Sequence, residues 1–232
     1  MTIDAILWDY DGTLVNSAPK NISVTKDILS EVAPHLCGKG LPEHLKSESR
    51  YHEANHAAKN WRDLYLNLFG LTHEETELAG SMWSKYQRLN TTPVAPFDGI
   101  IDVIEMFTNV PQGICSQNSA ANIKALLDSL SITAYFKFVA GYEEVSIDRQ
   151  KPASNAGLMC LDRILGEVRN KTLLVIGDHE VDVMFARNIS SDIDGSNTVI
   201  SIAVLYSGAE PEEWEHQPDQ VISRPAELAE FL

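Results

Sequence analysis

Cysteine and basic residues are scarce in this chain, and each scarcity excludes a class of protein. The three cysteines, Cys37, Cys115 and Cys160, are widely separated among 232 residues. Their number and spacing suit neither a disulfide framework nor a cysteine metal site. Lysine and arginine number 18 against 33 aspartate and glutamate residues, for a formal net charge of -15. Because nucleic acids bind surfaces with an excess of Lys and Arg, we expect no nucleic-acid partner.

Long apolar segments are also missing. No apolar run approaches the roughly 20 residues that a membrane-spanning helix needs. Asp4 and Asp9 interrupt the apolar segment near the N-terminus, which argues against a secretory leader. We therefore expect no membrane partner. A cytoplasmic, reducing location fits the cysteine content best.

Short apolar segments alternate with segments of helical spacing through much of the chain. Strands that alternate with helices predict right-handed crossovers and a mostly parallel sheet with helices on both faces. The fold class that we expect is α/β, with a doubly wound, Rossmann-like core. The expected strands are Ala5–Trp8, Gly113–Cys115, Phe138–Ala140, Leu173–Ile176 and Val199–Val204, and the expected helices are about Ile100–Thr108, Ala120–Leu130, Ala153–Leu165 and Val181–Asn188.

Residues 16–92 follow a different pattern from the rest of the chain. Apolar residues such as Ile22, Ile28 and Leu29 recur there at helical spacing, and no convincing strand is present. The proline-rich run at 91–96 is typical of a linker that returns to the sheet. We therefore predict two domains: a Rossmann-like core of residues 1–15 and 93–232, and a small α-helical cap domain of residues 16–92.

The most informative motif is Asp9-Tyr10-Asp11-Gly12-Thr13, directly after the first expected strand. Residues two apart on a strand face the same side, so both carboxylates can point into one site. Gly12 allows the chain to turn sharply away from the strand. Two acids in one site repel each other unless a cation or a shared proton intervenes. The motif is therefore suited to a nucleophile, a proton donor and a hard metal ion, although a solvated acidic turn is the alternative.

Three further segments place polar residues after expected strands or before expected helices. Ser116, Gln117 and Asn118 follow the second strand, Lys151-Pro152 precedes a helix, and Asp178 and Asp182 follow the fourth strand. Because ligands of open α/β sheets bind beyond the carboxyl ends of the strands, these segments can share one site. Each also has an ordinary structural explanation: Ser and Asn cap helices, a lone Lys is solvated, and Asp178 can be a helix N-cap with Asp182 in solvent.

The four segments, in this order, resemble motifs one to four of the haloacid dehalogenase superfamily. The run from Asp9 to Ser17 resembles the phosphoglycolate phosphatase-like branch, with Asn16 where that branch usually has Asp. The C-terminal part, from Val204 through Gly208 to Leu228, is similar to the same branch. The resemblance covers the whole chain and identifies the helical insert as a small cap between motifs one and two.

The resemblance implies a Mg²⁺-dependent phosphohydrolase that cleaves a small phosphomonoester through an aspartyl phosphate. Asp9 is then the nucleophile, and Asp11 is the general acid and base. Ser116 and Lys151 act on the transferring phosphoryl group. The implied residue sets are Gly12, Thr13, Ser116, Gln117, Asn118 and Lys151 for substrate binding, and Asp9, Asp11 (through its backbone carbonyl), Asp178 and Asp182 (directly or through water) for the metal.

Several alternatives remain open at this stage. A sugar-phosphate mutase of the same superfamily is one, although the mutase branch carries a His where this chain has Asn21. A dehalogenase and a phosphonate-cleaving enzyme fit Asp11 less well. A non-catalytic regulatory or binding protein with the same fold is another alternative, although no motif residue has been lost.

The sequence says least about the substrate and the assembly. We expect a small phosphorylated metabolite as partner, and a monomer or a homodimer. Arg50, His52, His56 and Lys59 in the helical insert are candidates for contact with a substrate anion. A solvated polar helix face is the favoured explanation of the same residues.

Overall fold

The computed structural model describes residues 2–38, 40–58 and 60–232. The chain divides into two compact units, one of Met1–Val15 with Pro96–Leu232 and one of Asn16–Ala95. The chain passes from one unit to the other at β2 (Val15–Asn16) and β3 (Ala95–Pro96), two short strands that pair with each other. Each unit is described below by itself.

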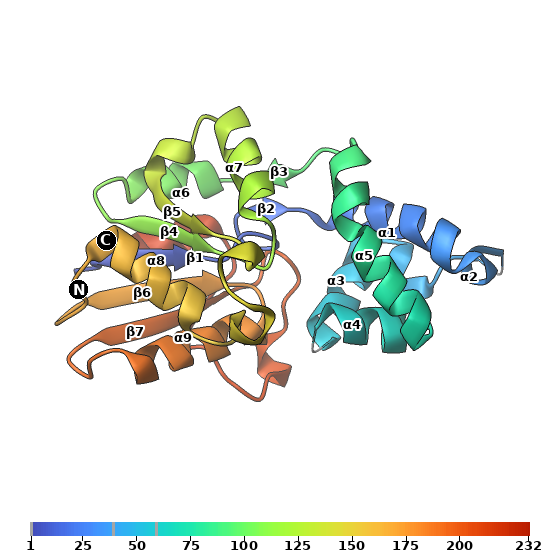
Figure 1. Ribbon diagram of the computed structural model, residues 1–232. Helices are drawn as coiled ribbons and strands as arrows, with labels where there is room; N and C mark the ends of the chain where they lie inside the picture. The colour runs from blue at the N-terminus through green and yellow to red at the C-terminus, as the bar shows by residue number, and fades with distance from the viewer. Residues whose placement is uncertain (1, 39, 59) are drawn as a thin grey trace. The chain divides into compact units, whose positions relative to one another are not determined.

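A six-stranded parallel sheet forms the centre of the first unit (Figure 1). The strand order is β5-β4-β1-β6-β7-β8, so that the N-terminal strand lies in the middle and is buried along its whole length. Trp8, the last residue of β1, pairs with Ile114 of β4 and Ile176 of β6. The strands are β1 (Ala5–Trp8), β4 (Gln112–Cys115), β5 (Phe136–Ala140), β6 (Thr172–Gly177), β7 (Thr198–Val204) and β8 (Gln220–Ile222).

Helices cover both faces of this sheet, which confirms the expected doubly wound α/β fold. On one face, α8 (Asn155–Leu165) and α9 (Glu180–Asp192) pack against alternate residues of β1 and β6 (Figure 1). On the other face, the Trp8 indole donates to the Gln112 side chain at 2.9 Å, and Gln112 donates to two carbonyls of the α6 region. Among the described residues, the other α-helices of this unit are α6 (Ile100–Met106) and α7 (Ala120–Ser129).

The second unit consists mainly of helices around its own apolar core. Apolar residues of α1, among them Ile28 and Leu29, are completely buried there. Thr72 and Glu75 form a reciprocal capping box that fixes the start of the last helix. The helices described are α1 (Ala18–Val32), α2 (Pro34–Gly38), the 3-10 turn Glu43–Leu45, α3 (Glu48–Ala57), α4 (Trp61–Asp63), the π-helical turn Leu64–Leu68 and α5 (His73–Leu89).

The structure differs from the sequence expectations mainly at the ends of elements. Helix α8 begins at Asn155, two residues later than expected, and α9 continues to Asp192 instead of ending near Asn188. Helix α9 is longer because Ile189 lies one turn after Phe185 and continues the buried stripe. Strand β8 was missed because three residues, one of them buried, carry almost no periodic signal.

Candidate active site

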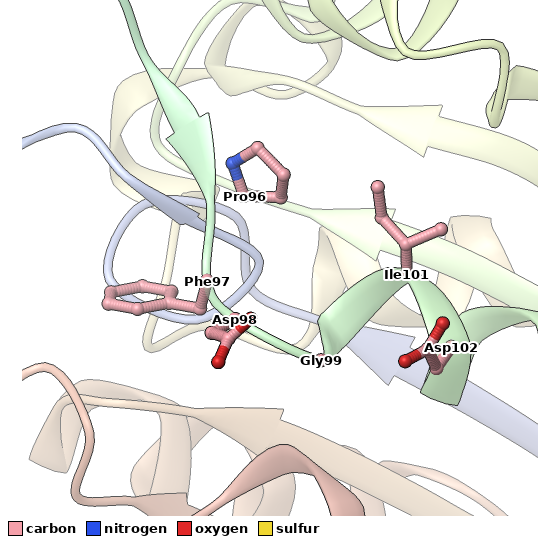
Figure 2. A pocket seen from close by; sticks show the side chains of 6 residues that line it. All are labelled: Pro96, Phe97, Asp98, Gly99, Ile101 and Asp102. Carbon is pink, nitrogen blue, oxygen red and sulfur yellow. The ribbon is translucent and has the colours of Figure 1, made fainter.

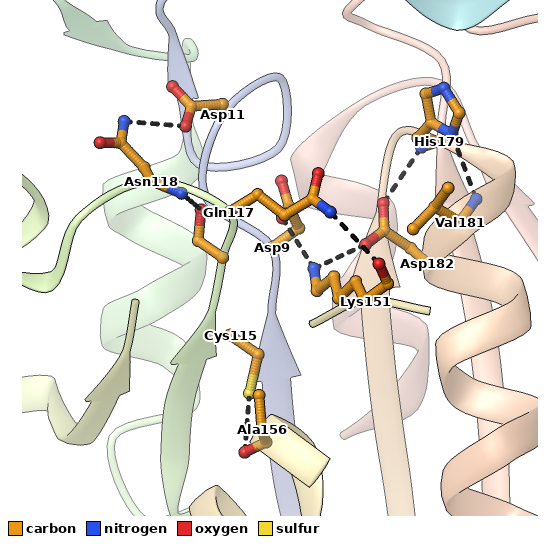
Figure 3. A network of polar contacts seen from close by, with 11 residues as sticks. Asp9, Asp11, Cys115, Gln117, Asn118, Lys151, Ala156, His179, Val181 and Asp182 are labelled. Atoms are coloured by element: carbon orange, nitrogen blue, oxygen red, sulfur yellow. Dashed lines mark hydrogen bonds and ion pairs between the residues drawn. The ribbon is translucent and has the colours of Figure 1, made fainter. Parts of the chain in front are cut away.

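The carboxyl ends of three neighbouring strands bring the sequence motifs together. Asp9 follows β1, Ser116 follows β4, and Asp178 follows β6. Because β4 and β6 pair with β1 on its two sides, these three residues lie at one edge of the sheet. Figure 3 shows side chains from all four sequence segments around this edge. The site lies within the first unit.

Three carboxylates and one ammonium group form the centre of the site. Asp9, Asp178 and Asp182 each offer an oxygen within 4.8 Å of the others. The Lys151 ammonium lies 2.8 Å from an oxygen of Asp9 and 2.6 Å from one of Asp182 (Figure 3). Only 5% of the Lys151 side chain is exposed, so it is not a solvated lysine. Three acids and one base leave an excess of negative charge here.

Burial and neighbouring charges shift the pKa values of this cluster. Burial raises the Asp9 pKa well above its ordinary value, and the nearby Asp182 and Asp178 carboxylates raise it further, against the opposing effect of Lys151. Burial alone lowers the Lys151 pKa, but the Asp182 and Asp9 carboxylates outweigh burial and raise it. Lys151 therefore stays charged. A further positive charge would reduce the electrostatic repulsion among the crowded carboxylates.

The cluster fits a hard divalent cation. Carboxylate oxygens are the ligands that Mg²⁺ prefers, and three of them converge here with one compensating charge. The backbone at Gly12 comes so close that an added Cβ would lie 2.5 Å from Cγ of Asp178. An added Cβ at Gly177 would overlap the Asp182 carboxylate. Because neither glycine has a Cβ, the acidic side chains can converge close to the backbone at both positions.

The start of helix α9 holds Asp182 in place. His179 is the N-cap: its ring Nδ1 accepts from the Val181 N–H at 3.1 Å. In return the His179 N–H donates to Asp182 at 3.2 Å, which completes a capping box. The alternative expectation, in which Asp178 caps this helix and Asp182 is solvated, is wrong. His179 is the N-cap, and the Asp182 side chain is buried, as Asp178 is, with both residues 6% exposed.

Asp11 and the residues after β4 form a second group beside the cluster. The Asn118 side-chain amide donates to the Asp11 carboxylate at 2.9 Å (Figure 3). The Asn118 backbone N–H donates to the Ser116 hydroxyl at 3.0 Å. Gln117 donates to the Lys151 carbonyl at 3.2 Å. Ser116 is 8% exposed and does not cap α7, because Ser119 does. The Asp11 carboxylate is not part of the three-acid cluster, and metal binding through the Asp11 backbone carbonyl stays a prediction.

Sequence reasoning missed two contacts that come from the loop after β7. Ser207 donates to Asp178 at 3.1 Å, and the Tyr206 hydroxyl donates to the Thr13 carbonyl at 2.8 Å. Thr13 itself is completely buried, and its hydroxyl has no hydrogen-bond partner among the described residues. The sequence offered two signals: this loop also follows an expected strand, and the segment from Val204 through Gly208 resembles the phosphoglycolate phosphatase-like branch.

The candidate residues of the helical insert lie in and after α3. His52 and His56 are half-buried, with ring centroids 6.0 Å apart, and Arg50 contacts Glu43. Lys59 lies outside the described residues. Whether any of these residues meets a substrate stays a prediction.

A separate hollow lies at the start of α6 (Figure 2). It contains none of the residues that the motifs singled out. Its lining consists of Pro96, Phe97, Asp98, Gly99, Ile101 and Asp102.

Comparison with known proteins decides the family. A sequence model described as "Haloacid dehalogenase-like hydrolase" matches residues 6–193. The chain belongs to this family. The match includes all four motif segments of this haloacid dehalogenase-like hydrolase, and the predicted family is thereby confirmed.

Two curated relatives are phosphoglycolate phosphatases. The protein from Photorhabdus laumondii is 30% identical over 193 residues, which cover 80% of this chain and 76% of the relative. The protein from Mesorhizobium japonicum is 24% identical over 246 residues, which cover 100% of this chain and 97% of the relative. These relatives confirm the phosphoglycolate phosphatase-like branch and indicate that the hydrolase is a phosphatase.

Solved structures confirm the fold of the hydrolase. A haloacid dehalogenase-like family protein from Streptococcus pneumoniae superposes with a TM-score of 0.72 at 18% identity and covers 99% of each chain. A haloacid dehalogenase superfamily hydrolase from Geobacter sulfurreducens has a TM-score of 0.64 at 18% identity and covers 100% of each chain. Among the described residues, no helix has the length and apolar character needed to cross a bilayer.

Proposed function

We propose that the enzyme is a Mg²⁺-dependent phosphatase that cleaves a small phosphomonoester through a phosphorylated Asp9. The observation that carries this proposal is the buried group in which Lys151 lies between Asp9 and Asp182, with Asp178 completing the three acids. The two curated relatives make a phosphorylated two-carbon acid, 2-phosphoglycolate, the first substrate to test.

The chain's own residues account for both halves of the reaction. An Asp9 oxygen attacks phosphorus, an Asp9–phosphorus bond forms, and the bond from phosphorus to the leaving oxygen breaks. Asp11 gives its proton to the leaving alkoxide. Asp11 then takes a proton from the water that attacks the aspartyl phosphate and releases inorganic phosphate. The hydrogen bond from Asn118 holds Asp11 for these transfers.

Lys151 and Ser116 stabilise the negative charge on the transferring phosphoryl group. Lys151 offers a buried positive charge 2.8 Å from the nucleophile, and Ser116 offers a hydroxyl at the end of β4. Gly12, Thr13, Gln117 and Asn118 are the further residues that we assign to substrate binding. The N–H groups of Gly12 and Asn118 donate within the chain, to the Val15 carbonyl and the Ser116 hydroxyl, so we assign the backbone donor role to Thr13 and Gln117. When bound by Asp9, Asp178, Asp182 and the Asp11 carbonyl, Mg²⁺ neutralises the acids and the phosphate oxygens.

The helical unit is assigned a role as a cap that selects compact substrates. It leaves and rejoins the core through β2 and β3, two connections that can act as a hinge. We infer that small phosphorylated metabolites are cleaved well and that folded phosphoproteins are cleaved poorly. The acidic surface also disfavours nucleic acids. The measurement compares kcat/KM for both substrate types, and a preference for the phosphoprotein would refute the assigned cap role.

The test of the proposed function is a screen of the purified protein against small phosphomonoesters with Mg²⁺, followed by excess chelator. We expect release of inorganic phosphate that stops in chelator. Conversion of one sugar phosphate into its isomer without phosphate release would identify the mutase alternative. Absence of any turnover across the screen would support a binding or regulatory protein. The cytoplasmic location and a monomeric or homodimeric state stay predictions.

A further inference from the structure

The loop that follows β7 contacts the site at two adjacent residues. The Ser207 hydroxyl donates to Oδ2 of Asp178 at 3.1 Å. Ser207 is 4% exposed and Asp178 is 6% exposed, so water competes little for this hydrogen bond. This hydrogen bond restricts rotation of the Asp178 carboxylate, which is one of the three acids that offer an oxygen to the cluster.

Tyr206 contacts a different part of the site, the turn that carries the second acid. Its hydroxyl donates to the Thr13 carbonyl at 2.8 Å. The turn is closed locally by the Gly12 N–H, which donates to the Val15 carbonyl at 2.9 Å. The Tyr206 ring also packs on Phe97, with centroids 4.8 Å apart. Tyr206 therefore contacts the chain on both sides of the helical insert, next to β2 and next to β3.

The electrostatic surroundings keep Tyr206 in its donating form. Burial raises the Tyr206 pKa, and the charges of Asp178 and Asp9 raise it further. The phenol therefore keeps its proton at any pH at which the enzyme would work. Neither residue of the pair has a carboxylate or an imidazole, which is why neither stands out as a functional residue in the sequence.

We propose that Ser207 and Tyr206 are positioning residues of the metal site, Ser207 for the Asp178 carboxylate and Tyr206 for the Asp11–Thr13 turn. This inference rests on the proposed function, because it assigns the two residues to the cation site and to the turn of the general acid. Residues that hold a metal ligand by a hydrogen bond typically change metal affinity about 10–100-fold when they are removed.

Calorimetric titration with Mg²⁺ alone tests the role of Ser207 without any turnover. We expect Ser207→Ala to bind Mg²⁺ about 10–100-fold more weakly than the unaltered protein. Ser201→Ala is a matched control, since Ser201 is also buried and donates to a carboxylate, that of Asp219, at 2.7 Å. Ser201→Ala removes the same kind of hydrogen bond from a residue of β7. We expect this variant to lower the melting temperature and to leave Mg²⁺ affinity unchanged. Equal Mg²⁺ affinity in folded Ser207→Ala and in the unaltered protein would overturn the assignment.

Kinetics with Tyr206→Phe tests the second half of the proposal. This variant keeps the ring on Phe97 and removes only the hydroxyl, so we expect kcat to fall about 10-fold with KM little changed. Tyr135→Phe is the control, because that hydroxyl bonds a surface glutamate, Glu105, at 3.2 Å. An unchanged kcat in Tyr206→Phe would refute its role. If the unaltered protein neither bound Mg²⁺ nor released phosphate, the proposed function itself would fail, which is a separate result.

Discussion

Replacing Gly12 by alanine tests whether the site depends on the close approach of backbone and carboxylate. Gly12 has φ of +81°, and an added Cβ would lie 2.5 Å from Cγ of Asp178. An ordinary contact begins near 3.4 Å, and Oδ2 of Asp178 would be closer to the added Cβ than Cγ is, so one of the two groups must move by more than about 0.9 Å. A misplacement of about 1 Å in a catalytic site can cost about 10²-fold in rate. We therefore expect Gly12→Ala to lower kcat by about 10²-fold and to weaken Mg²⁺ binding.

Gly99→Ala separates this crowding from the cost of the backbone conformation. Gly99 has φ of +79°, and its added Cβ would meet nothing within 4 Å. Both variants place an L-residue in the left-handed region, at a cost of about 1–2 kcal/mol. Denaturant unfolding is expected to show that loss in both, whereas phosphatase assays and Mg²⁺ titration show a defect only in Gly12→Ala. Equal activity in the two variants would refute the reasoning, because the carboxylate would then tolerate the added methyl group.

Three further predictions follow from the site and from the sheet that supports it. Asp9→Asn abolishes turnover because it removes the nucleophile, and Asp11→Asn lowers turnover by about 10²–10⁴-fold because it removes the proton transfer. Steady-state assays check both variants, and full activity in Asp9→Asn would exclude the covalent route. Asp178→Ala weakens Mg²⁺ binding, and Ca²⁺ inhibits because its looser coordination misplaces the nucleophile; turnover that persists in excess chelator would contradict the metal requirement. Asp4, which accepts from the Thr172 N–H at 2.9 Å and pairs with Lys171 at 3.0 Å, has a pKa below its ordinary 3.8, chiefly because of the Thr172 hydrogen bond. Its contribution is therefore present above pH 4 and lost as the pH falls through its folded-state pKa, so Asp4→Ala lowers the free energy of unfolding by about 1 kcal/mol at pH 7 and by less at pH 3. Urea unfolding checks this, and an equal loss at both pH values would contradict the lowered Asp4 pKa.

The motifs predicted the parts of the site that follow strands. Asp9 and Asp178 could be placed at one sheet edge because a short apolar run ends directly before each of them, and parallel strands end together. The burial of Lys151 could not be predicted, because it depends on how the loop before α8 lies against Asp9 and Asp182.

The contacts from outside the motifs were beyond the reach of the sequence. Ser207 and Tyr206 reach the site through a loop whose path is set by the pairing of β7 with its neighbours, and no local pattern encodes that path. The start of α9 is similar: His179 is an uncommon N-cap, so the sequence offered only Asp178 as an alternative for that position.

Covalent capture of phosphorylated Asp9 tests the central proposal most directly. The protein is mixed with Mg²⁺ and a phosphomonoester that it hydrolyses, quenched in acid during turnover, and treated with borohydride, which reduces an acyl phosphate to an alcohol. Peptide mass spectrometry then locates the modified residue. The account predicts homoserine in place of aspartate at position 9 and none in the sample without substrate. Rapid turnover with position 9 unmodified, or modification at another aspartate, would contradict it.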